Sequence, residues 1–190
     1  MAVRVVKRRF TVEEYHRMAQ AGILTEDDRV ELIEGEIIET APIGSRHAAC
    51  VNRLNRLFSQ SVGDRAMISV QNPIRLGVHS EPHPDLALLK PRGDFYASAH
   101  PTAQDVLLVI EVAETSIDYD RQTRVPLYAR AGVPEVWLVD LSGTRVEVYR
   151  LPREGRYSDV RIALQGETLT PQALPDVVVR VDEILSFRNG

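Results

Sequence analysis

The chain has 190 residues, 44% of them hydrophobic, which is enough to bury one sizeable core and too few for two ordinary domains. Its 23 Lys and Arg against 27 Asp and Glu give a formal net charge of −4, which excludes a globally basic surface for nucleic acid and leaves only a local patch. The single cysteine, Cys50, excludes an intramolecular disulfide and a multi-cysteine zinc site. We expect one domain over residues 1–190.

The sequence contains no segment typical of membrane insertion or export. No apolar run approaches the roughly 18 residues of a membrane span. The opening residues lack the apolar core and small-residue cleavage site of a signal peptide. We therefore expect a cytoplasmic protein with no membrane partner.

The first third of the chain predicts two helices and a hairpin. Thr11 precedes Glu14 by three residues, which is the spacing of a capping box at the start of a helix. Glu34-Gly35 separates two runs typical of strands, and Ser45 is placed to cap a second amphipathic helix. The predicted elements are a helix over residues 12–21, strands over 29–33 and 36–39, and a helix from Ser45 onward.

The rest of the chain reads as short strands interrupted by one helical segment. Residues 118–130 have a helical pattern that Gly132 should end, which predicts a strand-helix-strand crossover. Residues 90–102, which contain Pro and Gly, read as a loop. The predicted strands cover residues 67–71, 74–76, 85–89, 106–112, 135–140, 145–149, 160–164 and 177–181. This order predicts an α/β fold with a central mixed β-sheet flanked by helices.

Two acidic residues stand where a buried strand would ordinarily have apolar ones. Glu111 lies among Val109, Ile110, Val112 and Ala113, where an unpaired carboxylate would cost several kcal/mol. It must be paired, protonated or metal-bound. The second acidic residue is Asp85. Taken alone, each residue favours a structural role, in which Asp85 caps a turn and Glu111 bonds an Arg or a buried N–H group.

Asp85 begins a second apolar strand, so the two carboxylates can lie at neighbouring strand ends and share one cation. An all-oxygen site of this kind suits Mg²⁺ or Mn²⁺ and the hydrolysis of a phosphodiester. A third acidic residue, Glu31, is flanked by apolar residues and is a better site candidate than Glu34 or Glu36, which lie at the predicted turn.

Five segments, in order, resemble a large bacterial restriction-endonuclease-like family within the PD-(D/E)XK nuclease superfamily. They are Glu31-Leu32-Ile33-Glu34-Gly35-Glu36, Pro84-Asp85-Leu86, Ile110-Glu111-Val112, Tyr119-Asp120 ahead of Tyr128, and Gly132-Val133-Pro134-Glu135-Val136-Trp137-Leu138-Val139-Asp140. The resemblance covers almost the whole chain. It implies a restriction-endonuclease-like fold and an Mg²⁺-dependent endonuclease that hydrolyses DNA, with a homodimer as its expected assembly.

The resemblance also implies roles for particular residues. Asp85 and Glu111 would bind the metal, the carbonyl of Val112 would add a ligand, and Glu31 would act as an auxiliary ligand or water-orienting base. Superfamily members usually have a Lys two residues after the acidic ligand, where this chain has Ala113. The family moves that Lys to the following helix.

Arg124 stands at the position of the relocated Lys. Arginine keeps the positive charge that stabilises a phosphate, but its pKa above about 12 prevents it from cycling as a base. Two alternatives to an active nuclease therefore stay open. One is a catalytically silent nucleic-acid- or protein-binding domain on the same fold, and the other is an oligomerising domain whose buried carboxylates form ion pairs.

Several other residues have side chains capable of binding or catalysis. His47 has the position to contact a phosphate or tune Glu31, or to lie as an ordinary capping or surface residue. Pro82 and Pro84 prevent His79 and His83 from forming a helical zinc pair. Cys50 reads as a buried inert thiol and Trp137 as a core or subunit-contact residue. A local positive surface, if present, would use Arg53, Arg56, Arg121, Arg124 and Arg130.

Overall fold

A computed structural model describes residues 6–25 and 27–186. The first five residues, which belong to the opening segment that we expect not to be a signal peptide, lie outside the described residues. The helical elements are α1 (Val12–Gln20), α2 (Ser45–Ser61), η1 (Gly63–Arg65), η2 (Ala103–Asp105), α3 (Ile117–Tyr119), η3 (Asp120–Arg124), α4 (Val125–Ala131) and α5 (Val181–Leu185). The strands are β1 (Val30–Ile33), β2 (Glu36–Glu39), β3 (Met67–Val70), β4 (Leu86–Leu89), β5 (Val106–Ala113), β6 (Glu135–Asp140), β7 (Arg145–Arg153), β8 (Arg156–Leu164), β9 (Thr168–Leu169) and β10 (Val179–Arg180).

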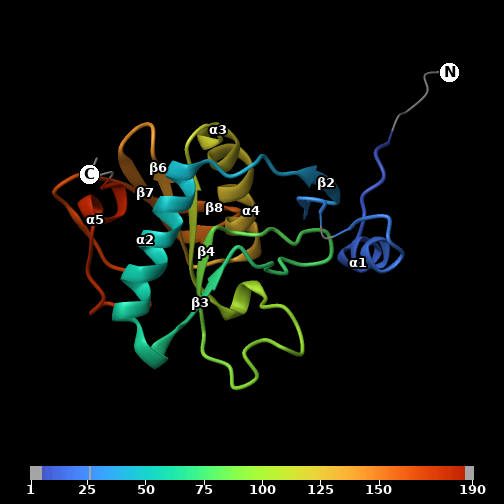
Figure 1. Cartoon of the computed structure of the whole chain (residues 1–190), viewed down its shortest axis with the longest axis horizontal. Helices are drawn as coiled ribbons and strands as arrows, with labels where there is room; N and C mark the ends of the chain where they lie inside the picture. The colour runs from blue at the N-terminus through green and yellow to red at the C-terminus, as the bar shows by residue number, and fades with distance from the viewer. Residues whose placement is uncertain (1–5, 26, 187–190) are drawn as a thin grey trace.

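A six-stranded sheet in the order β3-β4-β5-β6-β7-β8 forms the centre of the molecule (Figure 1). Strands β5 and β6 are parallel and are joined through α3, η3 and α4, whereas every other neighbouring pair is antiparallel. The sheet is therefore mixed, as the sequence predicts. The predicted crossover is confirmed, and Gly132 ends it in the left-handed conformation with φ 81°.

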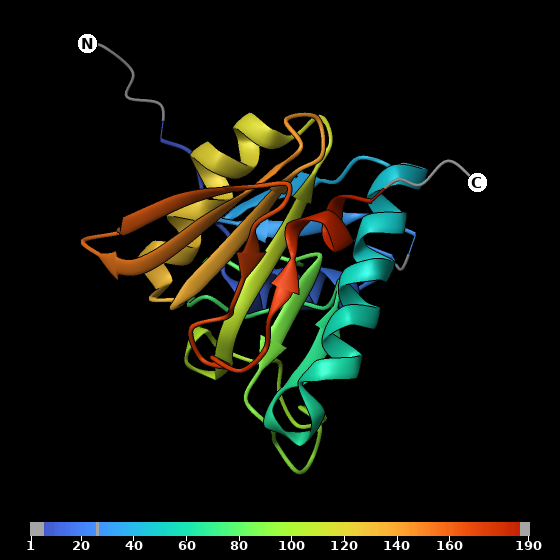
Figure 2. The same cartoon turned by 90° about the vertical axis from the view of Figure 1, so that its left-hand side faces the viewer.

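Side chains of the central strands alternate between two apolar cores. Leu86, Leu88 and Trp137 face the core under α2 and α5, while Ala87 and Leu138 face the core under α4. This alternation follows from the two-residue period of a strand. Figure 2 shows α2 along one side of the sheet and the α3–α4 segment on the other. Strands β4 and β5 are thus covered on both faces, which is why they read as near-continuous apolar runs.

The N-terminal part, from α1 to β2, stands beside the sheet, and the chain between β3 and β4 extends out to it (Figure 1). Two backbone hydrogen bonds join them, from Gly35 N to the carbonyl of His79 at 2.7 Å and from Glu81 N to the carbonyl of Leu32 at 2.7 Å. The β1–β2 hairpin is therefore held by the segment that leads into β4. None of the helices in the described part of the chain combines the length and apolar character that a membrane crossing needs.

The first predicted helix and hairpin are confirmed in detail. Thr11 Oγ1 accepts from Glu14 N at 3.1 Å, and Glu14 Oε2 accepts from Thr11 N at 3.0 Å, which completes the capping box. The hairpin pairs β1 with β2 around Glu34 and Gly35, whose φ values are 50° and 83°. Positive φ at both central residues is the turn geometry that matches the twist of a hairpin.

Three local predictions are wrong. Ser45 begins α2 but does not cap it, because Gly44 takes the N-cap position without a side-chain bond. Residues 74–76 form no strand, since Ile74 N and Leu76 N bond only to the nearby carbonyls of Pro82 and Ser80. Residues 177–181 hold only the two-residue strand β10 before α5 begins at Val181.

Replacing Gly35 by Ala tests how the hairpin is held. A Cβ at Gly35 would stand 2.5 Å from Arg9 Cβ and 2.9 Å from Arg9 Cα, in addition to the unfavourable positive φ. We expect Gly35→Ala to lower the free energy of unfolding by about 2–3 kcal/mol in denaturant titrations. The matched control is Gly166→Ala, which has φ 87° and nothing within 4 Å of the added Cβ. A loss at Gly35 no larger than that at Gly166 would contradict the contact with Arg9.

Candidate active site

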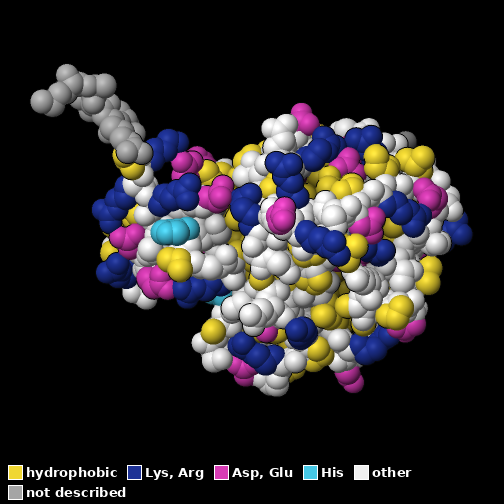
Figure 3. Space-filling view, turned by 180° about the vertical axis from the view of Figure 1, so that it is seen from behind, with side chains coloured by type: hydrophobic (Ala, Val, Ile, Leu, Met, Phe, Trp, Pro, Cys, Tyr) yellow, Lys and Arg dark blue, Asp and Glu magenta, His cyan; other side chains and the backbone are white. Residues whose placement is uncertain are grey.

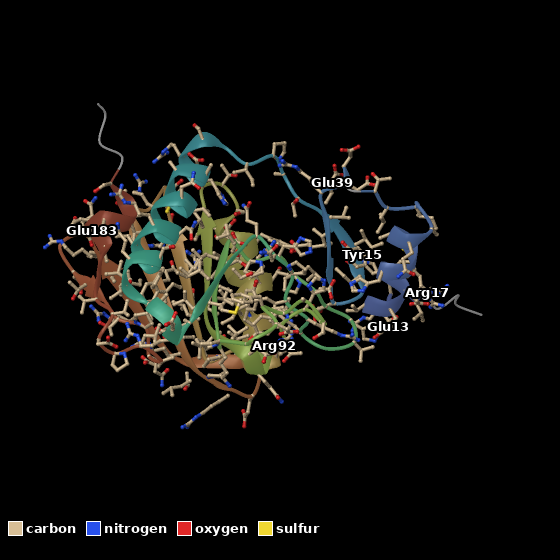
Figure 4. All side chains as sticks on the ribbon, turned by 60° about the horizontal axis from the view of Figure 1, so that its bottom comes forward. Glu13, Tyr15, Arg17, Glu39, Arg92 and Glu183 are labelled. Carbon is tan, nitrogen blue, oxygen red and sulfur yellow. The ribbon has the colours of Figure 1, made fainter. Side chains whose placement is uncertain are left out.

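A cleft of about 790 Å³ lies between the β1–β2 hairpin and the end of the sheet at which β4 begins and β5 finishes. Its walls come from the hairpin and the segment after it, from the start of α2, and from the end of β5 through η3. Glu39, in β2, lines the cleft. Figure 4 shows it on the same side of the molecule as Tyr15 of α1 and far from Glu183 of α5. Segments distant in sequence therefore enclose one cavity.

The structure brings Asp85 and Glu111 together at this end of the sheet. Leu86 pairs with Ile110 across β4 and β5, so the next residues of the two strands, Asp85 and Glu111, lie side by side at the cleft. Asp85 N donates to Glu111 Oε2 at 3.3 Å, and Val112 N donates to Asp85 Oδ2 at 2.9 Å. Antiparallel pairing thus fixes the separation of the two carboxylates through backbone contacts.

Arg124 is the central cation of the site. Its guanidinium is buried and contacts three carboxylates: Glu111 Oε1 at 3.0 Å, Asp120 Oδ1 at 3.2 Å, and Glu31 Oε1. The second oxygen of Glu31 accepts from the backbone N of His83 at 3.1 Å. One arginine therefore joins β1, β5 and η3.

A π-helical turn helps to aim Arg124 into the cleft. The turn, η3, joins α3 to α4, and both Asp120 and Arg124 within it are buried. Ser116 Oγ donates to Asp120 Oδ2 at 2.6 Å, which anchors that carboxylate. One turn later, Tyr128 donates its hydroxyl to Glu111 Oε1 at 2.6 Å. Turns of this kind recur at functional sites because they re-aim side chains within a continuing helix.

The cleft is lined by more acidic than basic side chains. We call Glu31, Asp85, Glu111 and Asp120 the carboxylate cluster; Arg124 contacts three of these residues, and the fourth, Asp85, does not contact it. Burial raises the pKa of Glu111 to about 8, an effect that nearby Asp85 and Asp120 reinforce and Arg124 opposes. Burial likewise raises the pKa of Asp120. A cation entering the cleft would relieve this imbalance.

His47 adds a titratable group beside the cluster. Its Nε2 lies 2.8 Å from Asp85 Oδ1, and that hydrogen bond raises the pKa of the imidazole. His47 therefore contacts Asp85 and not Glu31, the residue that the sequence suggested it tunes. The side chain of His83 also borders the cleft, where burial lowers its pKa.

The oxygen donors fit a hard divalent cation that keeps several waters. Mg²⁺ is commonly held by one or two carboxylates and completes its octahedron with water and substrate. Asp85 and Glu111 supply such a pair of carboxylates at the cleft. Among the described residues, no three His, Cys, Asp or Glu side chains form a ready-made metal cage. The donor set therefore suits a hydrated Mg²⁺ or Mn²⁺ better than a zinc ion enclosed by protein.

Sequence reasoning found Glu31, Asp85, Glu111 and Arg124, and all four lie in one site. It assigned no role to Asp120 or Tyr128, although both stood in the motif that carried the family resemblance. The signal for Asp120 was its four-residue spacing from Arg124, which lets the two side chains meet on a helix. The bond from Tyr128 to Glu111 had no signal in the sequence.

The remaining candidates lie outside the site chemistry. Cys50 is fully buried, and burial raises its pKa to about 12, which fits an inert thiol. Trp137 is fully buried and donates to Glu135 Oε1 at 2.8 Å, so it is a core residue. His79 Nδ1 lies 2.9 Å from the carbonyl of Phe10.

The suggested arginine surface does not form as one patch. Arg124 is buried, and Arg121 binds Glu147 at 2.7 Å. Arg53 donates to the carbonyl of Ile184 at 3.3 Å, and Arg130 pairs with Glu34 at 3.1 Å. Most of these arginines thus have partners within the chain.

Comparisons with known proteins agree with this architecture. Residues 12–182 match the model of a family described as "Uma2: Putative restriction endonuclease". A crystal structure from Anabaena variabilis, titled as a putative nuclease belonging to DUF820, superposes with a TM-score of 0.72 at 17% identity, covering 93% of this chain and 97% of the other. At that identity the likeness shows the fold alone. No curated protein matches the chain.

Removing Arg124 should destabilise the fold, because its carboxylate partners would stay buried without their cation. We expect Arg124→Ala to lower the free energy of unfolding by about 3–5 kcal/mol in denaturant titrations. The control is Arg130→Ala, whose ion pair with Glu34 is half-exposed and should contribute less than about 1 kcal/mol. Equal losses in the two variants would show that Arg124 does not hold the cluster together.

Proposed function

This chain belongs to the Uma2 family of restriction-endonuclease-like proteins, and we propose that it is a metal-dependent endonuclease that hydrolyses phosphodiester bonds of DNA. The observation that carries the proposal is the meeting of Asp85 and Glu111 at the end of two central strands, inside a cleft that also contains Glu31 and Arg124. A cation bound between Asp85 and Glu111 would offset the mutual repulsion of these neighbouring carboxylates. The family resemblance suggests hydrolysis of phosphodiester bonds, a reaction that a bound divalent cation assists.

Asp85 and Glu111 would hold Mg²⁺ or Mn²⁺, with the carbonyl of Val112 as a further oxygen donor. When bound, such an ion lowers the pKa of water and stabilises the extra charge on an attacked phosphodiester. The chain itself positions the ligands: Val112 N fixes one oxygen of Asp85, and Tyr128 and Arg124 both donate to Oε1 of Glu111. These contacts leave the two carboxylates little freedom to rotate away from each other.

Glu31 and Arg124 act together in this proposal. The guanidinium of Arg124 keeps Glu31 ordered at the cleft wall, where it serves as an auxiliary ligand or orients water. Arg124 also provides a fixed positive charge that offsets part of the cluster's negative field before DNA approaches. Because an arginine stays protonated, it does not take a proton from the attacking water.

A second candidate function is a catalytically silent domain that binds nucleic acid or protein on the same fold. The contacts of Arg124 favour it, since its guanidinium is already bound to three carboxylates of the chain. In that case the cluster would still bind metal, but cleavage would be lost. Metal binding and cleavage must therefore be measured separately.

Metal binding can be tested by calorimetric titration of the parent protein with Mn²⁺. We expect one saturable site in the parent and its loss in Asp85→Asn, which removes one of the two proposed carboxylate ligands. Asp118→Asn is the matched control, because it makes the same change of charge at an exposed side chain outside the cleft. If the parent binds no Mn²⁺, or if Asp85→Asn binds as tightly as the parent, the proposed site is wrong.

Cleavage separates the two candidate functions. We expect the parent to nick plasmid DNA in Mn²⁺ or Mg²⁺ and Glu111→Gln to lose at least about 100-fold of that rate, as is usual when a metal site is broken. Arg124→Lys then tests whether a lysine in place of this arginine changes the rate of cleavage. A parent without cleavage that gains it as Arg124→Lys identifies a decayed nuclease, and absence of cleavage in both, despite Mn²⁺ binding, favours the binding domain.

A further inference from the structure

Strand β8 leaves one edge of the central sheet open. It is the last strand in the order and runs for nine residues, Arg156–Leu164, which is a length of about 30 Å. Within the described residues, no backbone group from Ser158 to Ala163 bonds to any segment except β7. The opposite edge strand, β3, has only four residues. An open edge of this length is a ready template for another strand.

The β7–β8 hairpin projects from the rest of the sheet in Figure 2 and faces the viewer in Figure 3, where hydrophobic side chains lie among charged ones. Three aliphatic side chains of β8 are more than half exposed: Val160 at 54%, Ile162 at 51% and Leu164 at 54%. They pair across the ladder with Tyr149, Glu147 and Arg145 and so share one face of the strand. This exposed stripe has no covering element in the described chain.

The opposite face of β8 carries charges of both signs around Val160. Asp159 and Arg161 flank that residue, and both are exposed. If two copies of β8 ran antiparallel with Val160 opposite Val160, Asp159 of each copy would stand opposite Arg161 of the other. Opposite charges placed directly across an antiparallel pair are stabilising. Shifting the register by one residue would remove both pairs, so the sequence of the strand complements itself in one register.

We propose that two copies of this chain associate through β8, continuing the sheet across a two-fold axis at Val160. The contact would satisfy the open backbone groups of both strands, bring the aliphatic stripes together and form two Asp159–Arg161 pairs. A contact of this kind is isologous, because the same patch serves in both copies.

The two clefts of this dimer lie far apart. The two-fold axis that relates the paired β8 strands is normal to the sheet, so each strand of one copy runs antiparallel to the equivalent strand of the other copy. The cleft lies where β5 ends, and the two clefts would therefore open at opposite ends of the joined sheet. Each cleft would act alone on its own substrate, and dimer formation would not be needed for the chemistry proposed above.

Sedimentation velocity over a concentration series tests the association. We expect the parent to be a dimer that dissociates on dilution and Asp159→Arg to raise the dimer Kd by about tenfold or more, because Arg would then face Arg161 of the other copy. Arg161→Asp should do the same, and the double variant Asp159→Arg/Arg161→Asp should regain the parent Kd. Arg161 also pairs with Glu167 at 2.7 Å, so Glu167→Gln serves as the control that loses this ion pair only.

A second comparison tests the apolar stripe. Val160→Lys places two like charges at the axis and should abolish the dimer, whereas Val178→Lys changes an equally exposed valine outside the strand and should not. Hydrogen exchange in the parent should slow at amides of β8 as concentration rises. A parent that stays monomeric, or a dimer that survives both Val160→Lys and Asp159→Arg, would overturn the proposal. Mn²⁺ binding measured on the same variants should be unchanged, which separates this inference from the proposed metal site.

Discussion

The buried guanidinium of Arg124 is the constraint on which the site depends. It contacts Glu31 from the hairpin, Glu111 from the central sheet and Asp120 from the crossover, so one buried cation links three parts of the chain. Because a buried carboxylate is costly without a partner, this cation offsets part of the cost of burying each of these acids. The same side chain, through Glu31, also holds the hairpin against the sheet.

The fold was largely predictable because its central strands are read directly from the sequence. Apart from Glu111, Glu135 and Asp140, residues 106–112 and 135–140 are apolar, which is the pattern of strands covered on both faces. Asp85 and Glu111 stand out as candidate site residues for the opposite reason, since Glu111 lies within such a run and Asp85 directly precedes one. Once the two strands pair, their common edge follows, and the hydrophobic pattern sets the register that brings the carboxylates together.

What the sequence could not predict depends on contacts between distant segments. Residues 74–76 have the composition of a strand, but the amides of Ile74 and Leu76 bond to carbonyls of the same loop. Only Arg75 reaches another segment, as an isolated bridge to the loop before β5, so no ladder forms. Residues 177–181 look like one strand, yet α5 takes over at Val181 because that face packs in the core under α2. Likewise, the spacing of Asp120 and Arg124 lets the two meet on one helix, but the contacts of Arg124 with Glu31 and Glu111 depend on the folded chain.

Arginine at this position changes how the site can work. A lysine ammonium is a compact charge that can move and lose a proton, whereas a guanidinium has a planar fork that is held by several partners at once. Here the fork is engaged by carboxylates on three sides, so its charge is fixed in place and its protons stay with it. In the proposed function, water would therefore be activated by a cation held at Asp85 and Glu111, with Glu31 or His47 beside it. An arginine at this position would thus place the chemistry on the metal and not on a mobile base, and the carboxylate cluster would be the part of the site that selects the ion.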